Sequence, residues 1–287
     1  MKKTTDGGRF AFLLKDLRFI PWALVALMVC WGLFSLVMYV YQDNMIFSPQ
    51  PILQAAVDQI AVDYSNTENV ELKMQDGTVI RGWIVKNNDP SRQHLLIYFG
   101  GNMEEVSHMV ADVQDLQGWS IMLMNYRGYG QSQGQPSEKA LFSDALEIYD
   151  YSSSRMGKHA RIVAMGRSLG TGVAVYLAQN RRVDGVILAT PYDSISSVAQ
   201  EEYPLVPIRP LIKHPFDSIS RAPSIKAPLL MLIATNDTVI PNWHSRELLK
   251  KWGGSSQLAV IQGADHGTII GTTEYWDAIK GFLQFSS

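Results

Sequence analysis

Cysteine is nearly absent from this chain of 287 residues, which has only Cys30. One thiol cannot form a disulfide within the chain and cannot build a cysteine metal site, so the redox compartment is left open. An excess of charge of one sign is missing as well, because the formal net charge is −2. The charge balance therefore gives no reason to expect nucleic acid as a partner, and we expect none.

Two nucleotide-binding motifs are also missing from the glycine-rich stretch 166–172. No lysine follows its glycines, as a P-loop requires. Val175 stands where a dinucleotide fingerprint needs glycine or alanine. What remains is Gly166-Arg-Ser-Leu-Gly170, the pattern Gly-x-Ser-x-Gly.

A long apolar run is present near the N-terminus. Residues 19–42 carry no charged side chain, and a run of about 20 such residues can span a bilayer as a helix. The alternatives are a buried core helix and a cleavable signal peptide. The run is longer than the roughly 7–15 residues of a signal sequence, and no small-residue cleavage site follows it. We therefore predict an uncleaved transmembrane signal anchor over 19–42.

The charges on either side of this run differ in sign. Basic residues precede it, at Lys2, Lys3, Arg9, Lys15 and Arg18, and no lysine or arginine follows until Lys73. Basic flanks usually stay in the cytoplasm. We expect residues 1–18 to form a cytoplasmic tail of a single-pass membrane protein. The domain of residues 43–287 would then be extracytoplasmic, which means periplasmic in a bacterium.

The rest of the chain alternates between short apolar runs and helical patterns. We predict a linker over 44–66, with prolines at 49 and 51, and a hairpin of 70–74 with 78–85 around an Asp-Gly turn. Further strands are predicted at 95–99, 120–125, 162–165, 185–189, 229–234 and 257–261, and helices at 103–116, 137–152, 243–251 and 273–285. Continuous apolar strands separated by helices predict an α/β fold with a mostly parallel twisted sheet flanked by helices.

The Gly-x-Ser-x-Gly pattern lies between a predicted strand and a predicted helix. This context is typical of a nucleophile elbow, in which a sharp turn exposes the serine, here Ser168. Its flanking glycines would let strand and helix approach closely. The backbone N–H of Leu169, at the helix start, would face a developing oxyanion. The alternative is an ordinary glycine-rich turn.

Two further candidates follow predicted strands, where parallel sheets place their ligands. Asp237 follows strand 229–234 and His266 follows strand 257–261. The imidazole would take the serine proton, and the carboxylate would fix its tautomer. Asp193, which also follows a strand, is the second candidate for the acid, although it resembles part of a helix cap.

The loop after strand 95–99 is expected to supply a second oxyanion donor, because such loops do so in sheets of this kind. It reads Gly100-Gly101-Asn102, and we predict the N–H of Asn102 as that donor. This chemistry needs no metal and no organic cofactor.

These motifs together resemble the α/β-hydrolase superfamily over roughly residues 45–287. The chain is most similar to a branch of membrane-anchored, short-lid serine hydrolases related to the fungal BEM-type polarity proteins. The resemblance rests on Gly100–Asn102, Asn125–Ser132 with Gly134 and Pro136–Glu138, Gly166–Gly172, Pro191–Ser194, Asn236–Asp237 with Val239 and Pro241, and Gly263 with His266. That family usually has His-Gly-Asn where this chain has Gly100-Gly101-Asn102.

The resemblance implies acyl-transfer hydrolysis and makes residues 192–228 a short lid insertion over the site. This insertion is apolar and rich in proline, which favours a lipid-like acyl substrate unless these residues only cover the core. We expect a serine esterase, thioesterase or lipase-like enzyme acting on a small-molecule or lipid-like acyl compound. A peptidase or amidase with the same residues, and a catalytically weak, membrane-tethered binding protein, are the alternatives.

Overall fold

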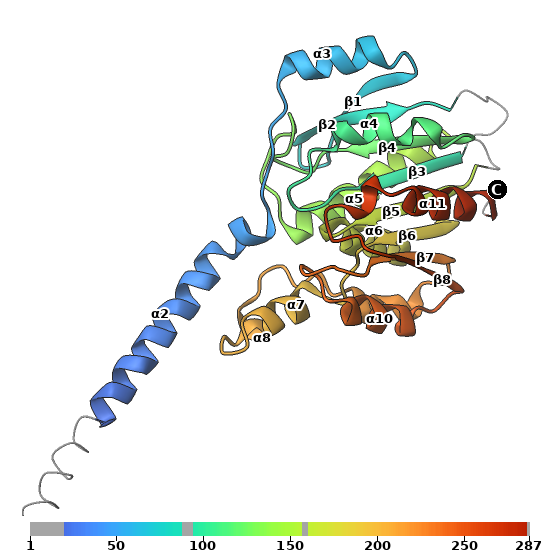
Figure 1. Ribbon diagram of the computed structural model, residues 1–287. Helices are drawn as coiled ribbons and strands as arrows, with labels where there is room; N and C mark the ends of the chain where they lie inside the picture. The colour runs from blue at the N-terminus through green and yellow to red at the C-terminus, as the bar shows by residue number, and fades with distance from the viewer. Residues whose placement is uncertain (1–19, 88–93, 157–159, 286–287) are drawn as a thin grey trace, which may run out of the picture.

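An eight-stranded sheet lies at the centre of the part of the chain described by the computed structural model, residues 20–87, 94–156 and 160–285 (Figure 1). The predicted basic tail, residues 1–18, lies outside the described residues. The strands are β1 (Thr67–Lys73), β2 (Val79–Val85), β3 (His94–Phe99), β4 (Trp119–Met124), β5 (Ile162–Arg167), β6 (Gly185–Ala189), β7 (Leu229–Ala234) and β8 (Ser256–Ile261).

The strand order across the sheet is β1-β2-β4-β3-β5-β6-β7-β8. The predicted hairpin is confirmed, since β1 pairs antiparallel with β2, and β2 also pairs antiparallel with β4. From β4 to β8 every neighbouring pair is parallel. The predicted α/β fold with a mostly parallel sheet is therefore confirmed. Because β3 and β5 are neighbours, the loops that follow them leave the sheet side by side.

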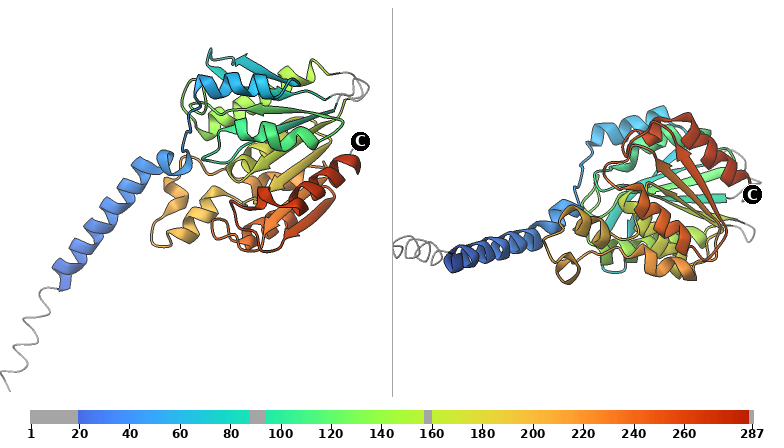
Figure 2. Two further views of the ribbon diagram at one scale, coloured as in Figure 1. Left: turned by 45° about the horizontal axis from the view of Figure 1, so that its top comes forward. Right: turned by 60° about the horizontal axis from the view of Figure 1, so that its bottom comes forward.

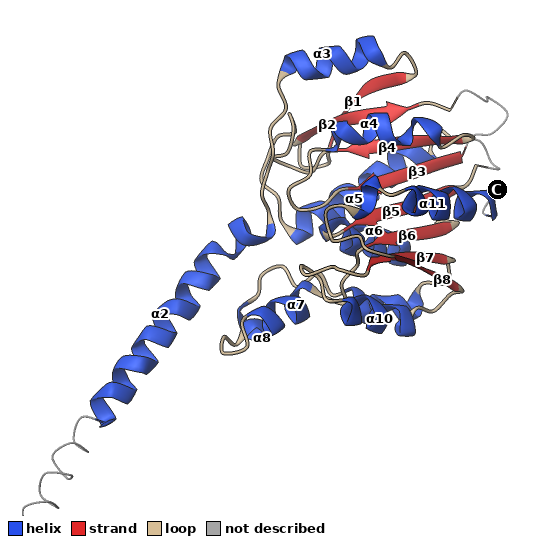
Figure 3. Ribbon diagram, in the orientation of Figure 1, coloured by secondary structure: helices blue, strands red, loops and turns tan. Residues whose placement is uncertain are grey.

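Helices cover both faces of this sheet, as Figure 3 shows. On one face lie α5 (Glu138–Ser153), α6 (Leu169–Asn180) and α10 (Asn242–Lys251), and on the other lie α4 (Met109–Asp112) and α11 (Thr273–Phe285). All six residues of β7 are buried, which explains why its sequence is continuously apolar and does not alternate.

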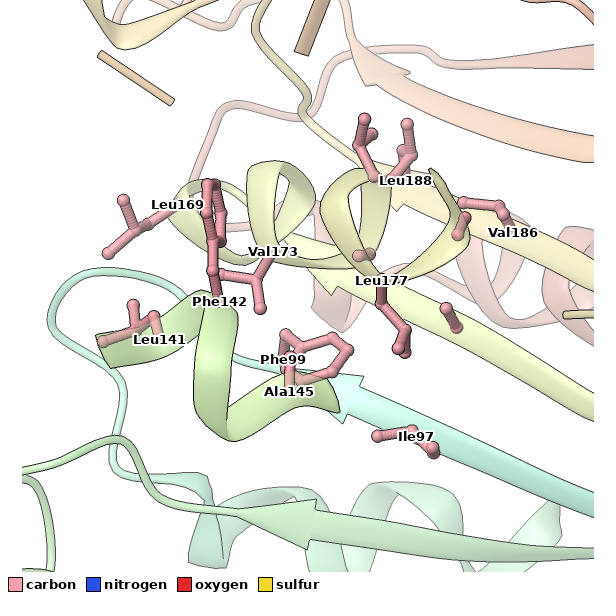
Figure 4. Close-up of a cluster of buried hydrophobic side chains, with 14 of the residues drawn as sticks. Ile97, Phe99, Leu141, Phe142, Ala145, Leu169, Val173, Leu177, Val186 and Leu188 are labelled. Carbon is pink, nitrogen blue, oxygen red and sulfur yellow. The ribbon is translucent and has the colours of Figure 1, made fainter. Parts of the chain in front are cut away.

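Helix α6 has the largest fraction of buried residues among these helices, with nine of its twelve residues buried. Figure 4 shows Val173 and Leu177 of α6 against side chains of β3 and α5, including Phe99 and Ala145. This packing fixes the start of α6, and therefore the serine that precedes it.

Two predicted segments were wrong. The predicted linker over 44–66 contains a helix, α3 (Gln54–Asp63), which packs on the sheet through Val57; the two prolines precede this helix and so do not interrupt it. The predicted helix over 103–116 is instead a 3-10 turn η1 (Val106–His108), α4, and a second 3-10 turn η2 (Val113–Asp115). Its expected first residues form a turn, because Glu104 accepts a hydrogen bond from Gly101 N.

The apolar N-terminal run forms one helix, α2 (Ile20–Ile46), which projects away from the sheet (Figures 1 and 2). Its most apolar 18-residue window has a mean hydropathy of 2.3 and is 6% buried. Within the described residues it is the one helix whose length and composition would allow it to cross a membrane. The helix continues beyond the predicted end at residue 42.

The 192–228 segment contains α7 (Ile195–Glu202), α8 (Ile208–Leu211), α9 (Ser218–Arg221) and the 3-10 turn η3 (Ala222–Ser224). Its α7–α8 part lies beside the C-terminal half of α2 in Figures 1 and 2. Hydrogen bonds join the two, from Trp31 Nε1 to Leu205 O and from Gln42 Nε2 to Leu211 O.

Candidate active site

Ser168 sits in the sharp turn between β5 and α6, with φ 50° and ψ −119°. Such a φ is uncommon for a residue with a side chain and is typical of functional turns. The flanking glycines make the turn possible. A Cβ at Gly166 would lie 2.3 Å from Gly170 O, and a Cβ at Gly170 would lie 2.0 Å from Phe99 O. Strand and helix therefore meet at a distance that only glycine allows.

The three residues predicted as a triad lie together, although they come from three different strand ends. His266 Nε2 lies 2.9 Å from Ser168 Oγ, and His266 Nδ1 lies 2.8 Å from Asp237 Oδ2. The other carboxylate oxygen of Asp237 accepts hydrogen bonds from the backbone N–H groups of Val239 and Ile240. The Asp237 side chain is 2% exposed, so its carboxylate is held rigidly behind the imidazole.

The second candidate for the acid has another partner. Asp193 Oδ1 lies 2.8 Å from Nδ1 of His244, a fully buried side chain of α10. His244 Nε2 contacts Glu201 of α7 at 3.0 Å, so this histidine joins α10 to the 192–228 segment. Asp265, next to His266 in sequence, accepts hydrogen bonds from Gly267 N and from Thr268. Neither carboxylate has a recorded hydrogen bond to His266 in the described structure.

The two predicted oxyanion donors line one cavity with Ser168 and His266. Leu169 is the first residue of α6, and the N–H of a first helical residue has no acceptor within its helix. Asn102 belongs to the loop that follows β3, beside β5. Its carbonyl accepts hydrogen bonds from Ser48 N and from Tyr129 Oη, which hold the peptide that follows Asn102.

The preceding residues of the loop are held as firmly. Tyr126 Oη donates to Gly100 O at 2.9 Å, so the motif 125–132 supplies two tyrosines that support the loop 100–102. Burial raises the pKa of Tyr129 to about 12 and that of Tyr126 well above its ordinary value. Both hydroxyls therefore stay protonated at neutral pH and remain donors.

Glu104 is a residue of this site that sequence reasoning missed. Its side chain is 5% exposed and accepts hydrogen bonds from Gly101 N and Tyr98 Oη, each at 2.6 Å. It also pairs with Arg167 Nη1 at 2.9 Å. Arg167 is the residue before Ser168, so one carboxylate joins the loop 100–102 to the serine turn. The loop lacks the histidine that is usual in the family that this chain resembles. The ion pair of Glu104 and Arg167 lies next to the loop, through the hydrogen bond from Gly101 N to Glu104.

The cavity beside Ser168 has a volume of about 630 Å³. This volume is within the ~300–1,000 Å³ usual for small-molecule sites. Most of its lining is apolar and comes from α2 and from the α7–α8 part of the 192–228 segment. Across the described ranges, no group of three histidine, cysteine or acidic side chains is arranged to hold a metal ion.

Comparison with known proteins agrees with this architecture. Residues 99–214 match the model of the α/β-hydrolase fold family. The chain is 30% identical over 220 residues to an uncharacterized protein of Mycobacterium tuberculosis, covering 75% of this chain and 78% of that protein. It is 31% identical over 225 residues to an uncharacterized membrane protein of Saccharomyces cerevisiae, covering 75% and 79%. An Arabidopsis thaliana α/β-hydrolase domain-containing protein, WAV2, is 26% identical over 242 residues, covering 76% and 78%.

Among solved structures, an esterase of Pyrococcus furiosus superposes with a TM-score of 0.64 at 17% identity. The match covers 84% of this chain and 97% of the esterase. At this identity, the likeness concerns the fold.

Proposed function

The chain belongs to the α/β-hydrolase superfamily, and from this membership we propose that it is a membrane-anchored serine hydrolase that cleaves acyl esters or thioesters. The observation that carries the proposal is the hydrogen-bonded series from Ser168 Oγ through His266 to Asp237, at 2.9 and 2.8 Å. A serine hydroxyl is a weak nucleophile until an adjacent base takes its proton. The three side chains supply nucleophile, base and orienting acid.

In the proposed reaction, Ser168 Oγ attacks the acyl carbonyl carbon while His266 Nε2 takes the hydroxyl proton. The bond from that carbon to the leaving oxygen or sulfur then breaks, and His266 returns the proton to the departing alcohol or thiol. Water, activated by the same imidazole, next attacks the acyl-enzyme and releases the acid. Asp237 keeps Nδ1–H directed at itself and stabilises the imidazolium formed in each step.

The negative charge that develops on the carbonyl oxygen would be held by the N–H groups of Leu169 and Asn102. Removing one such donor typically costs about 10²–10³-fold in kcat. The positions of both residues on the wall of the cavity, next to Ser168, support this role. The N-terminus of α6 adds a favourable partial positive charge at the same place.

The anchor is the second part of the proposal. Helix α2 is apolar and almost entirely exposed, which is the arrangement expected of a helix that lies in lipid and not in a protein core. Trp22 near one end and Tyr39 and Tyr41 near the other suit the two membrane interfaces. With the basic tail in the cytoplasm, the catalytic domain would be extracytoplasmic, and residues 192–228 would form its lid.

A fluorophosphonate probe tests the nucleophile, since it reacts only with an activated serine. The full chain should be labelled at residue 168, and Ser168→Ala should lose both labelling and hydrolysis of a short-chain ester. Labelling that persists in Ser168→Ala would refute the assignment.

The acid can be tested with a matched pair of substitutions. Asp237→Asn should lower kcat by roughly 10³–10⁴-fold, because a carboxamide favours the wrong imidazole tautomer. Asp265→Asn changes the neighbour of His266 and should leave kcat nearly unchanged, because the Asp265 carboxylate accepts hydrogen bonds from the backbone of the turn that follows it. Equal effects of the two substitutions would contradict the assignment.

A further inference from the structure

The helix predicted to anchor the protein also forms a wall of the substrate cavity. Side chains of α2 that line it are Met38, Tyr39, Gln42, Met45 and Ile46. The opposite wall comes from α7, α8 and the residues that join them, and Ser168 and His266 line the same space. The cavity is therefore incomplete without α2. A helix that served only to tether the domain would not need to line the cavity.

The lid is joined to α2 at two levels. At one level, Gln42 Nε2 donates to Leu211 O, and Lys213 N donates to Gln42 Oε1 at 2.6 Å. At the other, Trp31 Nε1 donates to Leu205 O at 2.6 Å. The lid therefore lies alongside the helix from residue 42 back to residue 31.

These levels can be compared with the thickness of a bilayer. Asp43 is the first charged residue after the apolar run, and it pairs with Lys213 and His214, so this cluster marks the polar boundary. Trp31 precedes Asp43 by twelve residues, which is roughly 18 Å along a helix. The hydrocarbon core is about 30 Å thick, so its midplane is roughly 15 Å from the boundary. The peptide of Leu205 therefore lies near the middle of the bilayer if α2 spans it.

The composition of the lid tip suits that position. Residues 203–208, Tyr-Pro-Leu-Val-Pro-Ile, carry no charge. The Leu205 side chain is 81% exposed, and Leu205 is the most exposed large apolar residue of the described chain. An exposed leucine at a loop tip gains nothing in water, whereas in hydrocarbon it contributes its full transfer free energy.

We propose that residues 203–208 insert into the leaflet on the side of the folded domain, and that the cavity receives the acyl chain of a bilayer lipid from within that leaflet. The chain would lie between α2 and the lid, with its carbonyl carbon at Ser168. This proposal rests on the proposed function, and it names the substrate class as membrane lipids with long acyl chains, reached without passage through water.

A photocrosslinking experiment tests the path of the chain. The full-length protein in phosphatidylcholine vesicles is treated with a long-chain alkyl fluorophosphonate that carries a diazirine near the end of the chain. After irradiation, the adduct on Ser168 should be crosslinked to residues 38–46 or 203–212. Crosslinks confined to other segments would overturn the proposed lipid path while leaving the hydrolase intact. Absence of any adduct on Ser168 would overturn the proposed function itself, and this inference with it.

A substitution pair tests insertion of the lid. Leu205→Asp places a carboxylate at the tip, and Leu53→Asp makes the same change at a leucine that is 78% exposed, before α3 on the far side of the fold. Because an ionised side chain opposes insertion into hydrocarbon, Leu205→Asp should lower the ratio of vesicle-lipid hydrolysis to soluble short-ester hydrolysis at least tenfold. Leu53→Asp should leave the ratio unchanged. An unchanged ratio in Leu205→Asp would overturn the insertion.

Discussion

Replacing Glu104 with glutamine should have opposite consequences in two backgrounds. In the native protein, the carboxylate is the partner of Arg167, whose side chain is 16% exposed, and the carboxylate itself is 5% exposed. Breaking a buried ion pair by neutralising one partner typically costs about 3–5 kcal/mol. We expect about 2–4 kcal/mol, because the arginine retains some contact with water and the amide oxygen can still accept from Gly101 N.

In an Arg167→Met background the same change removes a buried carboxylate that has lost its arginine. Glu104→Gln should then be neutral or stabilising, which amounts to a coupling of at least about 2–4 kcal/mol between the two residues. The measurement is a double-mutant cycle on the detergent-solubilised full chain, with unfolding followed by tryptophan fluorescence. Equal destabilisation by Glu104→Gln in both backgrounds would refute the reasoning.

The same substitution should also be visible in catalysis. Glu104 fixes the loop that carries Asn102. In the proposed mechanism, displacement of this loop would remove transition-state stabilisation and not ground-state binding. We expect kcat for a short ester to fall roughly 10- to 100-fold, below the full cost of losing an oxyanion donor, with KM little changed. A raised KM at unchanged kcat would instead mean that Glu104 supports only the binding surface.

Three other predictions concern the scaffold. Arg127→Ala should lower stability by about 3–5 kcal/mol, because it leaves Asp144 buried without its arginine; an unchanged melting temperature would contradict this. Burial raises the pKa of Glu138. At a pH just above the ordinary pKa of glutamate, this carboxyl is therefore protonated in the folded chain and ionised in the unfolded chain. The free energy of unfolding should therefore fall as the pH rises above that value. Glu138→Gln should reduce this dependence of stability on pH in thermal scans from pH 4 to 7. The same dependence in both proteins would show that Glu138 is not its source. Gly170→Ala should abolish folding, because its Cβ would lie 2.0 Å from a backbone carbonyl of β3. Gly281→Ala has no atom within 4 Å of the new Cβ, so it should be tolerated or should stabilise α11 by up to ~1 kcal/mol. Expression trials and circular dichroism distinguish the two outcomes.

Local sequence patterns were sufficient for most of the fold and for the candidate triad. Continuous apolar strands identified the parallel sheet, because a strand buried on both faces cannot alternate. Ser168 could be found from the glycines around it, and Asp237 and His266 from their positions after strands. The carboxyl ends of parallel strands lie at one edge of the sheet, so the positions of these residues after strands were enough to predict that they meet. Their catalytic roles are a proposal.

Other features were decided only by the tertiary structure. Nothing near Glu104 in the sequence indicates that it faces Arg167, because the two meet only when β3 and β5 become neighbours. Packing also decides which histidine each candidate acid contacts: Asp237 contacts His266, whereas Asp193 contacts His244. The 192–228 segment lies on α2 through contacts between residues more than 160 positions apart. Sequence periodicity reports which face of an element is buried, but the partner on that face is chosen by the packing of the whole chain.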